Sequence, residues 1–160
     1  MEYFELRELS ERLEIPIERI RYIVNQDLVP FRDWLVAEDE PGQPHRYDLV
    51  DSLFIACATY LLDAGQKRDS VKEIMKMMGK IMPDARNPLH VPLMGWAVTS
   101  KEKATVQIAD GLRIRWRHGS TDTGWVEVGP PRRRDDDFEP RVIVALDFGL
   151  IRDMVRGTKS

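Results

Sequence analysis

The sequence predicts an α+β protein, with a mainly helical first half followed by a small antiparallel β-sheet region. Apolar residues recur at helical spacing up to about residue 80, and strand-like alternation appears beyond that point. Prolines at positions 83, 88 and 92 mark the change. We therefore expect a helical domain over residues 1–82, a linker over 83–92, and a β-rich region with a short C-terminal helix over 93–160.

Two short helices joined by a tight turn are predicted at the start of the chain. Leucines at helical spacing indicate a first helix over residues 3–13. Ile15 precedes Pro16 and is therefore biased toward an extended conformation, which ends this helix. Pro16 suits the first position of a second helix, which fades near Asp27. Such a pair is a helix-turn-helix, whose second helix is presented to a partner.

The second helix carries an unusual polar face opposite its apolar stripe. Isoleucines fall on the side that a core requires. The remaining surface carries Arg19, Arg21, Tyr22, Asn25 and Gln26. Forked guanidinium groups and side-chain amides suit phosphates and base edges, whereas an ordinary solvated face favours Glu and Lys. A surface helix with no special role is the alternative, which the helix alone does not exclude.

A β-hairpin or loop is predicted over residues 31–46. Residues 34–36 are a candidate strand and residues 45–47 are the candidate returning strand, with an acidic tip between them. This hairpin would lie directly between the second helix and a longer third one.

Two further helices complete the first half. Asp48 suits the N-cap of a helix over residues 49–64, and Gly65 ends it. Asp69 or Ser70 is predicted to cap the next helix, whose methionines and branched apolar residues have core spacing.

The second half contains the strongest hairpin signal in the chain, an Asp110-Gly111 turn between two alternating segments. We expect an exposed loop over residues 129–140, where three arginines are followed by three aspartates. The predicted strands and final helix are residues 105–109, 112–116, 125–128, 142–148 and 150–156.

Composition restricts the function. The net charge is −3, and residues 1–80 are more acidic than residues 81–160, which argues against a generic nucleic-acid binder. The single cysteine, Cys57, excludes an internal disulfide and has the neighbours of a buried thiol. No apolar run reaches membrane-spanning length and the N-terminus is charged, so we expect a cytoplasmic protein.

No catalytic or metal-binding motif emerges from the sequence. The three histidines are far apart and lack a Cys/His cluster, and no glycine-rich phosphate loop occurs. We therefore expect no metal or other cofactor, and a protein that is not an enzyme.

Five motifs in the first half carry a resemblance to a known family. They are Leu6–Ser10, Ile20–Tyr22, Asp27–Pro30, His45–Tyr47 and Leu61–Gly65. Their order and spacing resemble the winged helix-turn-helix DNA-binding domain of the MerR family, and of relatives such as phage excisionases and small terminase subunits. The resemblance covers residues 3 to about 78; the C-terminal half resembles no family.

The resemblance implies a protein that binds double-stranded DNA sequence-specifically. It would be either a MerR-like transcriptional regulator or a phage-type accessory protein for DNA packaging or recombination. It implies DNA contacts by Arg21, Tyr22 and the wing residue Arg46, with Arg19, Asn25 and Gln26 as neighbours on the same face. The alternative is a degenerate winged helix that contacts another protein. A small-molecule effector is neither indicated nor excluded.

Five departures from the family pattern are present, two of which are a long wing with an acidic tip at residues 38–40 and a longer spacing after Gly65 to the next apolar position. Ile23 stands where many members carry an aromatic residue, and Asp27 stands where many carry glycine. No long heptad helix follows Met78, although such a helix forms the usual dimer. We therefore expect a homodimer formed through residues 93–160.

Overall fold

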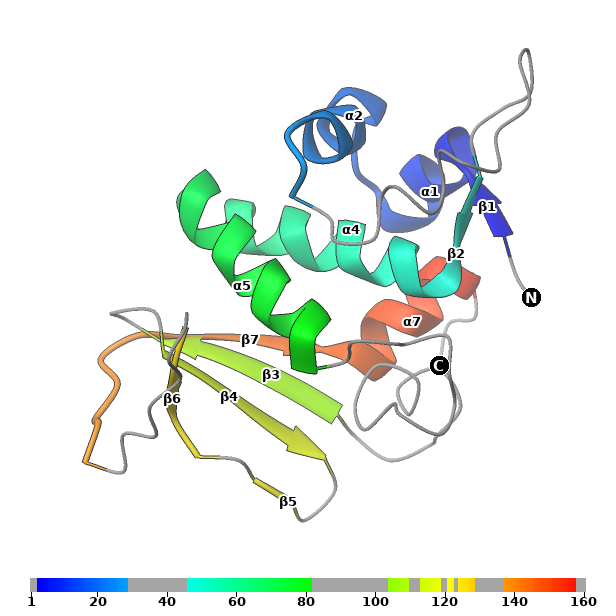
Figure 1. Cartoon of the computed structure of the whole chain (residues 1–160). Helices are drawn as coiled ribbons and strands as arrows, with labels where there is room; N and C mark the ends of the chain where they lie inside the picture. Colours follow the sequence, from blue (N-terminus) through cyan, green and yellow to red (C-terminus); the bar gives the residue numbers. More distant parts are fainter. Residues whose placement is uncertain are drawn as a thin grey trace.

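The structure is a computed structural model, and it describes residues 3–28, 46–81, 104–109, 113–118, 121–122, 124–128 and 137–157. These residues form five helices and two antiparallel sheets, which confirms the predicted α+β class (Figure 1). The predicted linker over 83–92 and the predicted strand over 34–36 lie outside the described residues.

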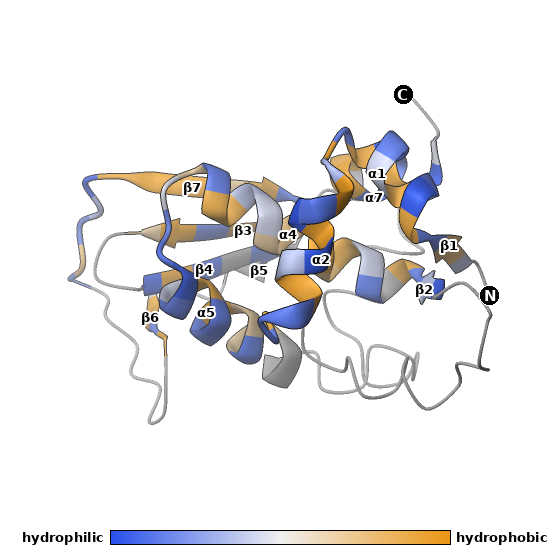
Figure 2. Ribbon diagram, turned by 90° about the horizontal axis from the view of Figure 1, so that it is seen from above, coloured by the Kyte–Doolittle hydropathy of each residue, from blue (hydrophilic) through white to orange (hydrophobic). Residues whose placement is uncertain are grey.

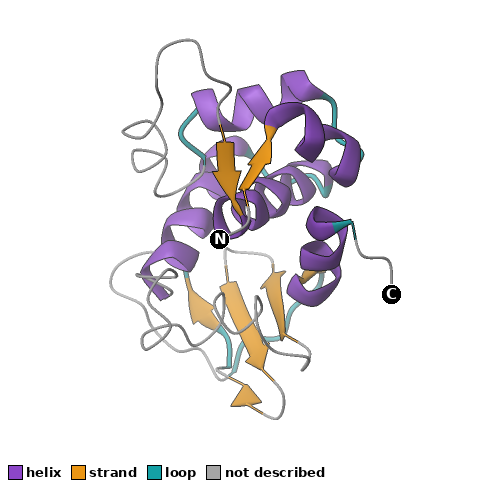
Figure 3. Ribbon diagram, turned by 90° about the vertical axis from the view of Figure 1, so that its right-hand side faces the viewer, coloured by secondary structure: helices purple, strands orange, loops and turns teal. Residues whose placement is uncertain are grey.

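The elements follow each other along the chain as β1 (Tyr3–Glu5), α1 (Leu6–Leu13), α2 (Ile17–Asn25), β2 (Arg46–Asp48), α4 (Leu49–Asp63), α5 (Arg68–Ile81), β3 (Ala104–Ala109), β4 (Arg113–His118), β5 (Thr121–Asp122), β6 (Val126–Glu127), β7 (Ile143–Asp147) and α7 (Phe148–Arg156). Figure 1 and Figure 3 place α1, α2, β1 and β2 at one end of the molecule and the larger sheet at the other.

The first three described residues form a strand, so the prediction of a helix over the whole of 3–13 is wrong at its start. β1 pairs antiparallel with β2, with Tyr3 opposite Asp48 and Phe4 opposite Tyr47. Phe4 and Tyr47 are buried, and this long-range pairing prevails over helical propensity in so short a segment. The returning strand predicted at 45–47 is confirmed as β2, although its described partner is β1.

The turn between α1 and α2 is held by its own hydrogen bonds. The Ser10 hydroxyl donates to the carbonyl of Ile15 at 2.6 Å, and Glu14 adopts a left-handed conformation with φ 55°. The amide of Arg19 donates to the carbonyl of Pro16, which makes Pro16 the N-cap. Helix α2 therefore begins at Ile17, one residue later than predicted.

Of the two helices that follow, α4 has its predicted N-cap and α5 does not. Asp48 is the N-cap of α4, accepting from the amide of Asp51 at 2.8 Å. The caps predicted for α5 are wrong, because α5 begins at Arg68, and Asp69 and Ser70 lie inside its first turn. Asp69 still occupies the positive end of the helix, where a carboxylate is favourable. The apolar residues of α5 predicted to face the core, Val71, Ile74, Met75 and Met78, are all buried.

The larger sheet has the strand order β5-β4-β3-β7, with β6 also pairing with β4. The predicted hairpin is confirmed as β3 and β4, whose register brings Ala109 opposite Arg113; the turn itself lies outside the described residues. The last strand and helix are also confirmed, with shifted boundaries. Asp147 accepts from the amide of Leu150 at 3.1 Å and starts α7 at Phe148 rather than at Leu150.

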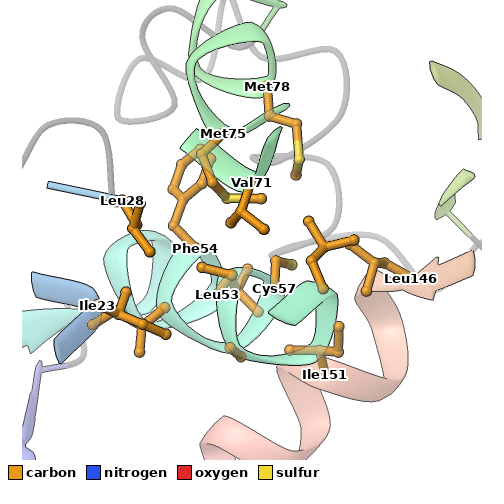
Figure 4. Close-up of a cluster of buried hydrophobic side chains, with 14 of the residues drawn as sticks. Ile23, Leu28, Leu53, Phe54, Cys57, Val71, Met75, Met78, Leu146 and Ile151 are labelled. Atoms are coloured by element: carbon orange, nitrogen blue, oxygen red, sulfur yellow. The ribbon is translucent and has the colours of Figure 1, made fainter. Parts of the chain in front are cut away.

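Helix α7 belongs to the core of the first half, although it lies far along the chain. It contacts α1 and α4, and the Arg12 guanidinium donates to the carbonyl of Val155 at 2.7 Å. Figure 4 shows Leu146 and Ile151 beside the buried side chains of α4 and α5. Cys57 lies in this cluster, and its complete burial raises the pKa of the thiol far above its ordinary value. The hydrophobic core therefore extends across both sequence halves.

Candidate nucleic-acid interface

Helix α2 separates its apolar and polar side chains cleanly. Ile20 and Ile23 are buried against the rest of the core, and α2 contacts both α1 and α4. Figure 2 shows hydrophobic (orange) and hydrophilic (blue) residues alternating along the ribbon of α2. The apolar stripe predicted from the sequence thus fixes which residues point outward.

Three of the predicted contact residues are exposed on this outward face. Arg21 and Asn25 are exposed, and Tyr22 keeps 43% of its surface accessible, which is high for a tyrosine. Within the described part of the chain, the side chains of these residues form no hydrogen bond or ion pair. They occupy positions i, i+1 and i+4 of one helix and therefore form a contiguous patch. We call Arg21, Tyr22 and Asn25 the α2 patch.

The two other predicted residues of this segment, Arg19 in α2 and the exposed Gln26 at its C-cap, contact other helices of the chain. Arg19 forms an ion pair with Asp63 at the end of α4. Gln26 accepts from the guanidinium of Arg68, at the start of α5, with a distance of 3.1 Å. These contacts tie both ends of α2 to neighbouring helices. The structure therefore gives Arg19 and Gln26 a positioning role.

Arg46 lies on a different element from the α2 patch. It is the exposed first residue of β2, opposite Glu5 in the strand register. An ion pair with Asp48 would be the simplest structural role for Arg46. Asp48 is instead buried, and its carboxylate caps α4. Among the described residues, Arg46 forms no ion pair.

Exposed acidic residues lie on the same helix-turn-helix as the α2 patch. Glu11, Glu14 and Glu18 are exposed on α1, on the turn and on the first turn of α2. Arg12 is partly neutralised, because it pairs with Glu8 at 2.8 Å and lies over the Phe4 ring at 5.1 Å. The local charge is mixed, so the face is suited to directional hydrogen bonds more than to bulk attraction of a polyanion.

The structure also contains an arginine cluster that the sequence reasoning did not single out. Arg113 and Arg115 project from the same face of β4, where they lie over the rings of Phe138 and Trp125 at 4.9 and 4.5 Å. Arg113 pairs with Glu127 at 3.3 Å, and Arg115 donates to Gln107 at 2.9 Å. The alternation Arg-Ile-Arg-Trp-Arg was the available signal.

This cluster covers one face of the sheet from within the chain. Trp125 is only 7% exposed and meets Phe138 edge-to-face, with ring centroids 5.6 Å apart. The arginines lie over these aromatic rings, so their described contacts stabilise the sheet. Trp125 is therefore part of the protein's own packing. Trp96 and the side chain of Trp116 lie outside what the structure describes.

The described residues contain no cluster of three or more His, Cys, Asp or Glu side chains that could hold a metal ion. No helix in the described ranges has the length and apolar character needed to cross a membrane. No family model matches the chain, and no curated protein matches it.

Proposed function

We propose that the protein binds double-stranded DNA sequence-specifically through the α2 patch, as a MerR-like regulator. The single observation that carries this proposal is the state of Arg21, Tyr22 and Asn25. All three are exposed on one face of a helix whose other face is buried, and their side chains have no partner in the described part of the chain.

The chemistry of the patch matches base edges in a major groove. An arginine bridges the O6 and N7 atoms of guanine, and an asparagine bridges N6 and N7 of adenine. The tyrosine hydroxyl suits a phosphate oxygen, which fixes the position of a helix without reading sequence. One helical turn separates Arg21 from Asn25, so both side chains can reach neighbouring base pairs in a groove that admits a helix.

The anchoring of α2 supports the same proposal. Arg19 and Gln26 hold the two ends of the helix against α4 and α5, so the patch has a fixed orientation before it meets a partner. A preorganised surface loses less conformational entropy on binding. Arg46, exposed on β2, is proposed to contact a phosphate beside the helix.

A second function is favoured by the exposed acidic residues on the same helix-turn-helix as the patch. Glu11, Glu14 and Glu18 would attract a basic protein, and the same tyrosine and arginine could then anchor a protein interface. This second function is the alternative named in the sequence analysis, a degenerate winged helix that contacts another protein.

One experiment separates the two functions. The full chain is used to select bound duplexes from a random DNA pool at moderate salt, and the enriched sequences are then titrated by fluorescence anisotropy. We expect an enriched motif of a few base pairs whose binding requires Arg21 and Asn25. A pool without enrichment, from a protein shown to be folded by circular dichroism, would refute DNA recognition.

A further inference from the structure

Arg12 joins three elements of the fold, one of which comes from the far end of the chain. Its guanidinium lies over the ring of Phe4 in β1, 5.1 Å from the ring centroid, and pairs with Glu8 of α1 at 2.8 Å. It also donates to the main-chain carbonyl of Val155, in the last turn of α7, at 2.7 Å. A ring face, a carboxylate and a carbonyl therefore surround one cation. We call these three contacts the Arg12 clamp.

The C-terminal end of α7 is shaped to meet this cation. Gly157 ends the helix with a φ of 75°, and its amide donates to the carbonyl of Met154 at 3.1 Å. A Cβ at Gly157 would lie 3.7 Å from Cζ of Arg12, so this position is directly beside the guanidinium. A cation at a helix C-terminus interacts favourably with carbonyls that have no partner within the helix. Arg12 therefore holds α7 by its end, while buried Phe148 and Ile151 hold it by its face.

The clamp connects the larger sheet to the helix-turn-helix. Asp147 is both the last residue of β7 and the N-cap of α7, so no loop separates the strand from the helix (Figure 1). Helix α7 contacts α1, and α1 in turn packs against α2. A change in the position of the sheet is therefore passed through α7 to the helix that supports α2.

We propose that Arg12 is a positioning residue for the α2 patch, acting through the docked end of α7. While the clamp is closed, α1 and α2 keep their orientation and the patch is ordered before it meets a partner. When the end of α7 is released, α1 and α2 open more often than the rest of the protein. An ordered patch loses less entropy on binding, so release of α7 lowers its affinity. The identity of the ligand as duplex DNA rests on the proposed function, whereas the clamp itself does not.

The chemistry of arginine provides the test variants. Its planar fork donates to several acceptors while stacking on a ring, whereas lysine is a point charge on a flexible stem. Arg12→Met keeps an apolar stem beside Phe4 and removes the charge and the donors, and Arg12→Lys keeps the charge alone. Arg7→Met is the matched control, because Arg7 is an exposed arginine on the same helix.

The first test measures amide hydrogen exchange along the full chain without DNA. We expect Arg12→Met to raise the exchange rates in α1, α2 and the last turn of α7 by about tenfold, and Arg12→Lys to be intermediate. The rates in β3 and β4 should change by less than about twofold, and Arg7→Met should match the wild type. Rates in α2 that Arg12→Met leaves unchanged, or that rise equally in β3 and β4, overturn the proposal.

Gly157→Ala tests the clamp from its other side. Alanine is strained in the left-handed conformation at the end of α7 and should fray the last turn, yet the change removes no charge. Exchange in α1 and α2 should accelerate as it does in Arg12→Met. The double variant should exchange there no faster than Arg12→Met alone, because both changes act on one contact. Additive effects of the two changes would overturn the clamp.

The second test uses the selected DNA duplex as the probe of the patch, at a temperature where circular dichroism shows every variant to be folded. We expect Arg12→Met and Gly157→Ala each to raise the dissociation constant by about threefold or more, without changing the slope of log K against log salt. A direct phosphate contact by Arg12 would weaken Arg12→Met alone and make its slope shallower. Wild-type affinity of Gly157→Ala therefore overturns control of the patch by α7. If the wild-type chain binds no duplex, the proposed function fails, and the exchange rates still decide whether the clamp positions α2.

Discussion

Arg21 provides the most direct test of the proposed interface. Its side chain is exposed and forms no hydrogen bond or ion pair with the described residues, so Arg21→Ala should change the free energy of unfolding by no more than about 0.5 kcal/mol. Loss of a bidentate contact to a base should weaken binding of the selected duplex by about 1–3 kcal/mol. That range corresponds to a dissociation constant about 5- to 150-fold higher, readily measured by fluorescence anisotropy.

Two controls separate base recognition from general charge. Lys76→Ala removes the same charge from the exposed side of α5, where Lys76 lies 3.4 Å from Glu73, and should leave affinity for the duplex nearly unchanged. Arg19→Ala removes an arginine from the same helix as Arg21. Because Arg19 pairs with Asp63, the variant should lose about 0.2–1 kcal/mol of stability and less affinity than Arg21→Ala. Unchanged affinity of a normally folded Arg21→Ala variant would refute the assignment of α2 as the reading helix.

Three further predictions concern the single residues Arg46, Asp48 and Glu14. Arg46→Ala should weaken all duplex sequences about equally and make the slope of log K against log salt shallower by about one unit; an identical slope would exclude a phosphate contact. Asp48→Ala removes the buried cap of α4 and should lower the free energy of unfolding in urea by about 0.5–2 kcal/mol. Glu14 adopts a left-handed backbone conformation, so Glu14→Gly should remove the strain of its side chain there and stabilise the protein by about 0.5–1 kcal/mol. The expected result is a higher Tm, and a lower Tm would argue against strain at this position.

Much of the local structure was predictable because it depends on neighbours in the chain. The apolar stripe of α2, the Asp48 cap and the β3–β4 hairpin all follow from residues a few positions apart. The strand at Tyr3–Glu5 was not predictable in this way, since it exists through pairing with β2 more than forty residues later.

The candidate site shows the same division. The spacing of the isoleucines indicated that Arg19, Arg21, Tyr22, Asn25 and Gln26 would face away from the core. It gave no information about which of them would meet another part of the protein. Arg19 finds Asp63 and Gln26 finds Arg68 only because α4 ends and α5 begins beside α2. Periodicity predicts the face of a helix, whereas the tertiary fold determines which side chains remain available on it.

Asp27 shows how a departure from a sequence pattern is accommodated. If the resemblance to the MerR family holds, Asp27 stands where many members carry glycine. Its φ of 55° lies in the left-handed region that glycine adopts without strain. Aspartate tolerates this region better than most residues, because its short polar side chain can hydrogen-bond locally. A backbone geometry that favours glycine is therefore adopted here by an aspartate.

The docking of α7 on α1 and α4 affects how the chain folds during its synthesis. Ribosomes add roughly 5–20 residues per second, so the segment between Ile81 and Phe148 takes several seconds to produce. Throughout that interval α1 and α4 lack the helix that covers them, and apolar side chains such as Leu9 and Phe54 belong to a core that is still incomplete. A nascent chain in this state exposes apolar surface that the finished protein buries, and the helical half reaches its final stability only after α7 has been made.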